Sequence, residues 1–333
     1  MLYIGGMGRS GSTLVERILG ATPGVCGLGE VAQIWQRLGR DDVCSCGRLL
    51  SACDFWSAVG AEAFGGWHTV DLDRMSEQQS RLEALRMQPR LAGSRLPPEL
   101  RAVIQRHAEH YARIYRAASA VSGSEVIVDS SKFSGLAFCL RWLPDLDLRV
   151  VHLVRDPRGV AFSFAKRVKQ PPRDGCDEMP RLAPARSAMY WAVQNSAFGL
   201  MAWSCRRTAG RGADGPAPVR LCRLRYEDFV ADPAAGLRTL ADFAGVQPSA
   251  VELSDLDAGR VRLDLSHSVA GNPMRFVAGD IRLRADEAWR TGLVPRQRFA
   301  VTAICAPWLA RYGYLGSGRP AARAVAGAQP APR

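Results

Sequence analysis

The sequence predicts an α/β fold built around a parallel sheet. Three observations predict it. Short runs of apolar and β-branched residues alternate along the chain with longer helical segments. A glycine-rich segment directly follows the first apolar run and opens a helix. The apolar run Arg149–Val154 (RVVHLV) is nearly continuous, which is typical of a strand buried on both faces.

The expected elements follow in chain order. Strands are expected in four segments: Leu2–Gly5, Val126–Asp129, Arg149–Val154 and Val219–Leu224. An apolar-faced helix follows the first strand, and the clearest later helices are Pro98–Ala118, Ser134–Trp142, Arg158–Val168, Arg186–Thr208 and Pro233–Ala244. The last of these has Asp232 as its N-cap and Pro233 at its first position.

We expect one domain over residues 1–315, with a helical insertion at about 40–120 between the first two expected strands. A chain of 333 residues with 47% hydrophobic residues can bury a core of that size. Proline and glycine mark Gln170–Pro184 and Gly210–Pro218 as loops, and the first is expected to act as a lid over the acceptor. The low-complexity tail at 316–333 is expected to be disordered.

The net charge of +12 comes almost entirely from arginine, since lysine occurs only at 132, 166 and 169. Together with the abundance of Ala, Gly and Pro, the excess resembles the codon bias of a GC-rich bacterial genome, which we expect to account for part of it; the rest suits an anionic ligand. No basic run is interleaved with aromatics, so we expect no nucleic-acid partner. No apolar stretch approaches the roughly 20 residues that span a membrane. Met1–Gly6 is too short for a signal peptide, so we expect a cytoplasmic protein.

Nine cysteines, an odd number without an export signal, favour reduced thiols. Cys44, Cys46 and Cys53 lie in one short glycine-containing segment. They suit a structural zinc with Cys26 or His68 as fourth ligand, a local disulfide, or free thiols in a tight loop. Because C-x-C is not the usual C-x2-C knuckle, we expect free thiols and no metal.

The segment Gly6–Thr13 (GMGRSGST) has the spacing of a Walker A loop, with Ser12 in the lysine position and a basic residue at Arg9 instead. Between a strand and a helix, its backbone N–H groups converge on an anion. Without the lysine that reaches β- and γ-phosphates, the loop favours a ligand that has no γ-phosphate and needs no metal. Ser10 and Gly11 line this loop, and Ser12 and Thr13 are expected to donate to a 5′-phosphate.

A second anion site is expected at the carboxyl end of the Arg149–Val154 strand, where ligands collect in parallel sheets. Arg155 leaves the strand there, Asp156 caps the next helix, and Ser163 lies two turns into that helix. Arg155 and Ser163 are therefore expected to reach one anion. Together with the first loop, they favour a nucleotide with two separate phosphates.

These residues carry a family resemblance. GRSGSTLVERIL followed by LVRDPRGVAFS resembles the 5′-phosphosulfate and 3′-phosphate signatures of the sulfotransferases that use 3′-phosphoadenosine 5′-phosphosulfate (PAPS), and it is closest in style to the bacterial and tyrosylprotein branch. Softer matches are RYED at Arg225–Asp228 and ARYGY at Ala310–Tyr314, so the resemblance runs from the first strand to Tyr314. It implies a P-loop-like three-layer α/β/α fold, PAPS as donor, no metal, and a hydroxyl acceptor on a small molecule, carbohydrate, lipid or peptide.

The resemblance also implies catalytic roles. Glu30 matches a glutamate that serves as base in the tyrosylprotein enzymes, although a helix-capping or salt-bridging glutamate is the alternative. Lys132 resembles a lysine that stabilises the bridging oxygen, although its spacing to the RDPR segment differs slightly from that of the family. From its place in the phosphate loop, Arg9 would meet the phosphosulfate. His267 is the rival base, because it lies in a run near the expected cofactor end. Arg275 is a candidate for the 3′-phosphate.

Two further functions stay open. Asp129 at a strand end is similar to a Walker B acid, which a P-loop small-molecule kinase would need along with magnesium. A non-catalytic nucleotide-binding module would keep nucleotide binding without needing Glu30 or Lys132. Tyr226 is expected to touch the nucleotide, whereas Trp191 and Trp289 are expected in the core. The oligomeric state is not readable from the sequence.

Overall fold

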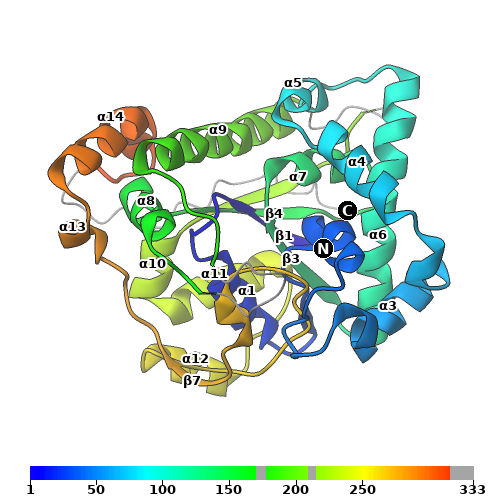
Figure 1. The fold of residues 1–333 in the computed structure, drawn as a ribbon, viewed down its shortest axis with the longest axis horizontal. Helices are drawn as coiled ribbons and strands as arrows, with labels where there is room; N and C mark the ends of the chain where they lie inside the picture. Colours follow the sequence, from blue (N-terminus) through cyan, green and yellow to red (C-terminus); the bar gives the residue numbers. More distant parts are fainter. Residues whose placement is uncertain (170–177, 209–214, 316–333) are drawn as a thin grey trace, which may run out of the picture.

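Five parallel strands form the central sheet of this computed structural model, which describes residues 1–169, 178–208 and 215–315. The strand order is β2-β3-β1-β4-β5, which places the first strand in the middle. Helices cover both faces of the sheet (Figure 1), which confirms the α/β fold and its three layers. The strands are β1 (Leu2–Gly6), β2 (Val25–Gly27), β3 (Val126–Lys132), β4 (Arg149–Val154) and β5 (Arg220–Arg225).

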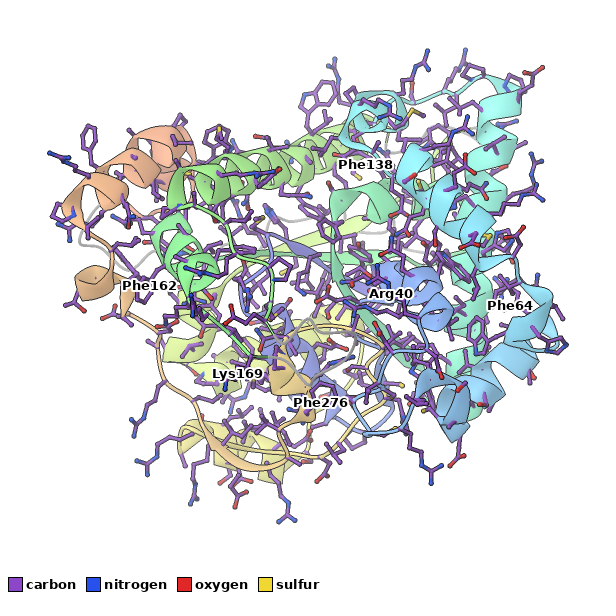
Figure 2. All side chains as sticks on the ribbon, in the orientation of Figure 1. Arg40, Phe64, Phe138, Phe162, Lys169 and Phe276 are labelled. Atoms are coloured by element: carbon purple, nitrogen blue, oxygen red, sulfur yellow. The ribbon has the colours of Figure 1, made fainter. Side chains whose placement is uncertain are left out.

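Side chains of the strands alternate between two apolar cores, as the period of two in a strand requires. Tyr3 and Val150 face one core with helices α6 (Pro98–Ser122), α7 (Ser134–Leu140) and α9 (Pro184–Thr208). Leu2, Ile4 and Val151 face the other core with α1 (Ser12–Gly20) and α11 (Pro233–Ala244). Figure 2 shows one residue of the first core, Phe138 of α7, between the sheet and the outer helices.

The helical insertion lies between β2 and β3, which is also between the first two expected strands, because β2 was not predicted. A strand of only three residues, VCG, carries no readable periodicity. The insertion begins earlier than the expected residue 40. Its helices are α2 (Ile34–Gly39), α3 (Asp54–Phe64), α4 (Leu72–Leu82), α5 (Gln88–Leu91) and α6, with short 3-10 turns η1 (Val31–Gln33), η2 (Leu50–Ala52), η3 (Trp67–Thr69) and η4 (Leu85–Met87) between them.

The second half of the chain adds a two-stranded antiparallel sheet that was also not predicted, formed by β6 (Arg260–Leu263) and β7 (Gly279–Arg282). Asp232 caps α11 as expected, because its side chain accepts from Ala235 N at 3.0 Å. The remaining helices are α8 (Pro157–Ala165), α10 (Tyr226–Ala231), α12 (Ala250–Asp257), α13 (Trp289–Gly292) and α14 (Pro295–Arg311), with the 3-10 turn η5 (Pro273–Phe276).

Several expectations fall on residues outside the described part of the chain. They concern most of the lid at Gln170–Pro184, much of the loop at Gly210–Pro218, and the tail at 316–333. The single domain over residues 1–315 stays a prediction. Among the described residues, no helix is long and apolar enough to cross a membrane.

Candidate active site

The phosphate loop joins β1 to α1 at the carboxyl edge of the sheet. Its backbone takes left-handed conformations at Arg9 (φ 65°) and Gly11 (φ 91°). A Cβ at Gly11 would lie 2.4 Å from Tyr226 Cδ2, so the close approach of the Tyr226 ring requires glycine there. Tyr226, expected to touch the nucleotide, therefore packs directly on the loop.

Two hydroxyls of the loop are suited to an anion. Ser10 Oγ and Ser12 Oγ are buried and find no hydrogen-bond partner among the described residues. Because buried polar atoms are rarely left without a hydrogen bond, these two hydroxyls indicate a bound ligand as their partner. Both lie at the start of α1, where backbone N–H groups and the helix dipole favour a phosphate. The residues present thus fit the 5′-phosphate group that the sequence predicts.

Arg155 lies across the loop, at the end of β4. Its Nη1 donates to Arg9 O at 3.0 Å, and its guanidinium lies 4.6 Å from the centre of the Tyr226 ring. Its Nη2 donates to Asp286 Oδ2 at 3.0 Å. Burial raises the pKa of Asp286, but the hydrogen bond and charge of Arg155 outweigh burial and hold this pKa below its ordinary value.

Asp286 is a site residue that the sequence did not reveal, because it lies 131 residues from Arg155 and no motif surrounds it. Ser163 is half-buried in α8, in the helix that follows Arg155. Trp191 and Trp289 are buried, as expected of core residues, and Trp191 Nε1 donates to Arg155 O at 3.0 Å. The core around α9 thus holds Arg155 in place.

Glu30 and Lys132 form a buried ion pair between Glu30 Oε1 and Lys132 Nζ. Lys132 ends β3 with a left-handed backbone (φ 71°), a strained conformation for a residue with a side chain. Gln33 Nε2 also donates to Glu30 Oε2. A Cβ at Gly271 would lie 3.5 Å from both Glu30 Oε1 and Thr13 Oγ1, so one small residue separates the carboxylate from the phosphate loop.

Glu16 fixes the backbone next to Glu30. Its two carboxylate oxygens accept from Gly29 N and Ser130 Oγ, which ties α1 to the segment before Glu30 and to β3. Burial raises the pKa of Glu16 to about 7. This role could not be predicted from the sequence, because Glu16 is one of several residues in an apolar-faced helix and no motif marks it.

The pKa of Glu16 predicts that stability depends on pH. In the unfolded chain Glu16 titrates near its ordinary value of 4.5, so between pH 4.5 and about 7 the folded chain binds more protons and stability falls as pH rises. The loss attributable to Glu16 is at most about 3 kcal/mol. Glu16→Gln, whose amide oxygen still accepts from Gly29 N, is expected to flatten the dependence of the melting temperature on pH in this window. An unchanged slope, equal to that of the exposed control Glu62→Gln, would show that Glu16 titrates normally.

Asp129 is less suited to the kinase alternative than its position at a strand end indicated. Its Oδ1 accepts from Ser131 N at 2.7 Å and its Oδ2 accepts from Tyr115 OH at 2.7 Å. Burial raises its pKa to about 6. Its oxygens thus hold β3 against α6, whereas a Walker B acid faces magnesium.

Two other candidates lie apart from Arg155. Arg275 Nη1 donates to Ser268 O at 2.9 Å, and its Nη2 donates to Val43 O at 3.0 Å, so backbone carbonyls hold the guanidinium. Arg275 packs near Gly271 and therefore lies on the side of the phosphate loop where Glu30 lies. Its role at the 3′-phosphate stays a prediction. His267 Nδ1 lies 3.3 Å from Cys53 Sγ.

The cysteine cluster differs from the expectation in its fourth member. Cys44, Cys46 and Cys53 lie together with His267, and neither Cys26 nor His68 belongs to the group. His267 follows β6, more than 200 residues along the chain, and no local spacing connects it to the cysteines. Under the zinc alternative, the fourth member of the group is therefore His267 and not Cys26 or His68.

Residues 2–249 match the profile of the sulfotransferase family. The chain belongs to this family. Its fold and its phosphate loop agree with that membership.

Known sulfotransferases show how far the similarity extends. Carbohydrate sulfotransferase 7 of Mus musculus is 31% identical over 202 residues, which cover 53% of this chain and 41% of the mouse protein. Carbohydrate sulfotransferase 2 of Homo sapiens is 27% identical over 193 residues, covering 51% and 36% respectively. The matched region thus spans about two-fifths of the length of these relatives.

Solved sulfotransferase structures are similar at lower identity. The sulfotransferase domain of the Synechococcus PCC 7002 olefin synthase has 21% identity and a TM-score of 0.48, with coverage of 92% of this chain and 94% of that one. Sulfotransferase STF9 of Mycobacterium avium has 14% identity and a TM-score of 0.44, with coverage of 93% and 76%.

Proposed function

We propose that this sulfotransferase moves a sulfuryl group from PAPS to a hydroxyl acceptor. The observation that carries the proposal is the position of the buried Glu30–Lys132 ion pair, which only Gly271 separates from the phosphate loop. In that loop the buried hydroxyls of Ser10 and Ser12 have no hydrogen-bond partner among the described residues. An acid–base pair beside an anion site is what transfer of an anionic group to a hydroxyl requires.

Each half of the site has a role in this proposal. Ser10, Gly11, Ser12 and Thr13 bind the 5′-phosphate through hydroxyls and backbone N–H groups. Arg9 neutralises charge on the sulfuryl group. On the other side of the loop Arg155, Tyr226 and Ser163 bind the nucleotide and its 3′-phosphate, with Arg275 as the alternative 3′-phosphate ligand.

Glu30 accepts the proton of the acceptor hydroxyl as the acceptor oxygen bonds to sulfur. The bond from sulfur to the 5′-phosphate oxygen breaks, and Lys132 stabilises the charge that gathers on this bridging oxygen. The existing ion pair keeps both side chains at the loop. The transfer itself uses no metal in this proposal.

The acceptor belongs to the class of hydroxyl compounds, which includes carbohydrates, lipids, small molecules and peptides. Carbohydrates are the first to test, because the curated relatives are carbohydrate sulfotransferases. A panel of sugars and phenols with PAPS, analysed by mass spectrometry for sulfated products, identifies the class. A panel that yields no sulfated product, with PAPS bound, would favour the non-catalytic module.

The donor is tested by calorimetry with 3′,5′-adenosine bisphosphate. We expect tight binding that is the same with and without added magnesium. ATP should bind weakly, because Ser12 occupies the position at which enzymes that bind nucleoside triphosphates have a lysine. Equal competition by ATP, or binding that requires magnesium, would favour the kinase.

A further inference from the structure

Three cysteines and a histidine meet at a point outside the proposed catalytic residues. Cys44 and Cys46 lie in the turn before η2, Cys53 directly precedes α3, and His267 comes from the loop after β6. Their ligand atoms all lie within 4.8 Å of one another. Figure 1 shows the chain before α3 beside the loop that follows β6, although more than 200 residues separate them.

Three of the distances within the cluster are close to the edges of a tetrahedron around zinc. Cys46 Sγ lies 3.7 Å from Cys53 Sγ, and His267 Nδ1 lies 3.3 Å from Cys53 Sγ and 3.8 Å from Cys44 Sγ. A zinc ion with sulfur ligands at about 2.3 Å and a nitrogen ligand at about 2.0 Å has S···S edges of about 3.8 Å and S···N edges of about 3.5 Å. A disulfide between Cys46 and Cys53 would need about 2.05 Å and would leave Cys44 and His267 without a role.

Neighbouring aromatic residues position His267 within the cluster. Phe55 stacks on the His267 ring at 4.8 Å and 15°, and Trp56 Nε1 donates to His267 O at 2.7 Å. Such outer contacts orient ligands in metal sites. Two of the three cysteines, Cys44 and Cys53, are buried.

We propose that Cys44, Cys46, Cys53 and His267 bind one Zn²⁺ in a closed tetrahedral site. Three thiolates and an imidazole are a donor set that zinc prefers, and four protein ligands leave no position for substrate. The site is therefore structural and takes no part in the sulfuryl transfer. It gives His267 a role as a ligand in place of a base.

The zinc site holds the loop that supports Glu30. Ser45, between two of the cysteines, donates from its N to Ser268 O at 3.2 Å and accepts at its Oγ from Ser268 N at 2.8 Å. The next residues reach the catalytic segment, since Val269 N donates to Leu28 O at 2.9 Å and Glu30 N donates to Ala270 O at 3.4 Å. Loss of the metal thus frees the loop that fixes the Glu30 backbone.

The proposal does not depend on the identity of donor or acceptor, so its test needs no activity assay. The full chain, purified without chelator, is expected to contain one zinc per chain by plasma mass spectrometry. Chain produced with cobalt is expected to show the intense visible bands of tetrahedral cobalt and the near-ultraviolet thiolate-to-cobalt band. A chelator strong enough to strip the metal should lower the melting temperature.

Substitutions distinguish the proposed zinc ligands from residues that do not bind the metal. Cys46→Ser and His267→Asn are expected to lose most of the zinc, whereas Cys26→Ser and His68→Asn are expected to retain it. If the ligand variants do not fold, alkylation of the native chain is the alternative test. Bound metal should protect the thiols of Cys44, Cys46 and Cys53 from alkylation, and a chelator that removes the metal should make them reactive. A chain without zinc, an oxidised Cys46–Cys53 pair in the purified protein, or octahedral cobalt bands would each overturn the proposal.

Discussion

Glu30→Gln is expected to lower the turnover number by about 10²- to 10⁴-fold, the usual contribution of a positioned base. The affinity for PAPS should stay nearly constant, because Glu30 lies beside the phosphate loop and is not part of it. The amide keeps the volume of the side chain and still accepts from Lys132 or Gln33, so the change removes basicity with little loss of packing. Steady-state kinetics and calorimetry on the same preparation separate the two quantities.

Two variants serve as its controls. Glu99→Gln changes an exposed glutamate of α6 and should leave turnover at the wild-type value. His267→Asn tests the rival base, and its zinc content is measured alongside its turnover. If a zinc-loaded His267→Asn chain is inactive while Glu30→Gln turns over normally, Glu30 is a structural carboxylate and histidine is the base.

Arg155→Ala is expected to weaken binding of 3′,5′-adenosine bisphosphate by roughly 10- to 150-fold, equivalent to about 1.5–3 kcal/mol for a charge-assisted hydrogen bond. The variant also removes the hydrogen bond to Arg9 O and the packing on Tyr226, so both sides of the phosphate loop lose support. Calorimetric dissociation constants measure the effect.

The salt bridge of Arg155 offers a matched counterpart. Asp286→Asn removes the carboxylate that pairs with Arg155 and leaves the guanidinium in place, so nucleotide affinity should stay constant or rise. If Arg155→Ala has no effect and Arg275→Ala weakens binding instead, the 3′-phosphate lies on the Glu30 side of the loop.

Local patterns predicted the framework of this chain well. Arg149–Val154 and Pro233–Ala244 have the expected bounds in the structure, because a continuous apolar run and an Asp-Pro start are strong signals over a few residues. The phosphate loop was readable for the same reason. Each of these features is encoded by neighbours in the chain.

Contacts between segments that are far apart in the chain could not be predicted from the sequence. Asp286 and Arg155, and the cysteines and His267, meet only after the chain has folded, and no spacing rule links residues so far apart. β2 was too short to show the alternation of apolar residues that marks a strand. The hydrogen-bond partners of Glu16 lie on β3 and on the segment before Glu30, which are distant from it in the sequence or outside its helix. Such features depend on tertiary packing, which overrides local propensity.

The central position of β1 has a consequence for how the protein is made. β1 leaves the ribosome before both of its neighbours, and its register partners on β3 and β4, such as Val128 and Arg149, are more than 120 residues away. Until they emerge, an apolar strand with two unpaired edges is exposed, which is a state prone to aggregation. Long-range pairing of this kind also slows folding. We therefore expect that truncated chains ending before β4 accumulate as insoluble protein, and that production at lower temperature or with added chaperones raises the yield of the folded enzyme.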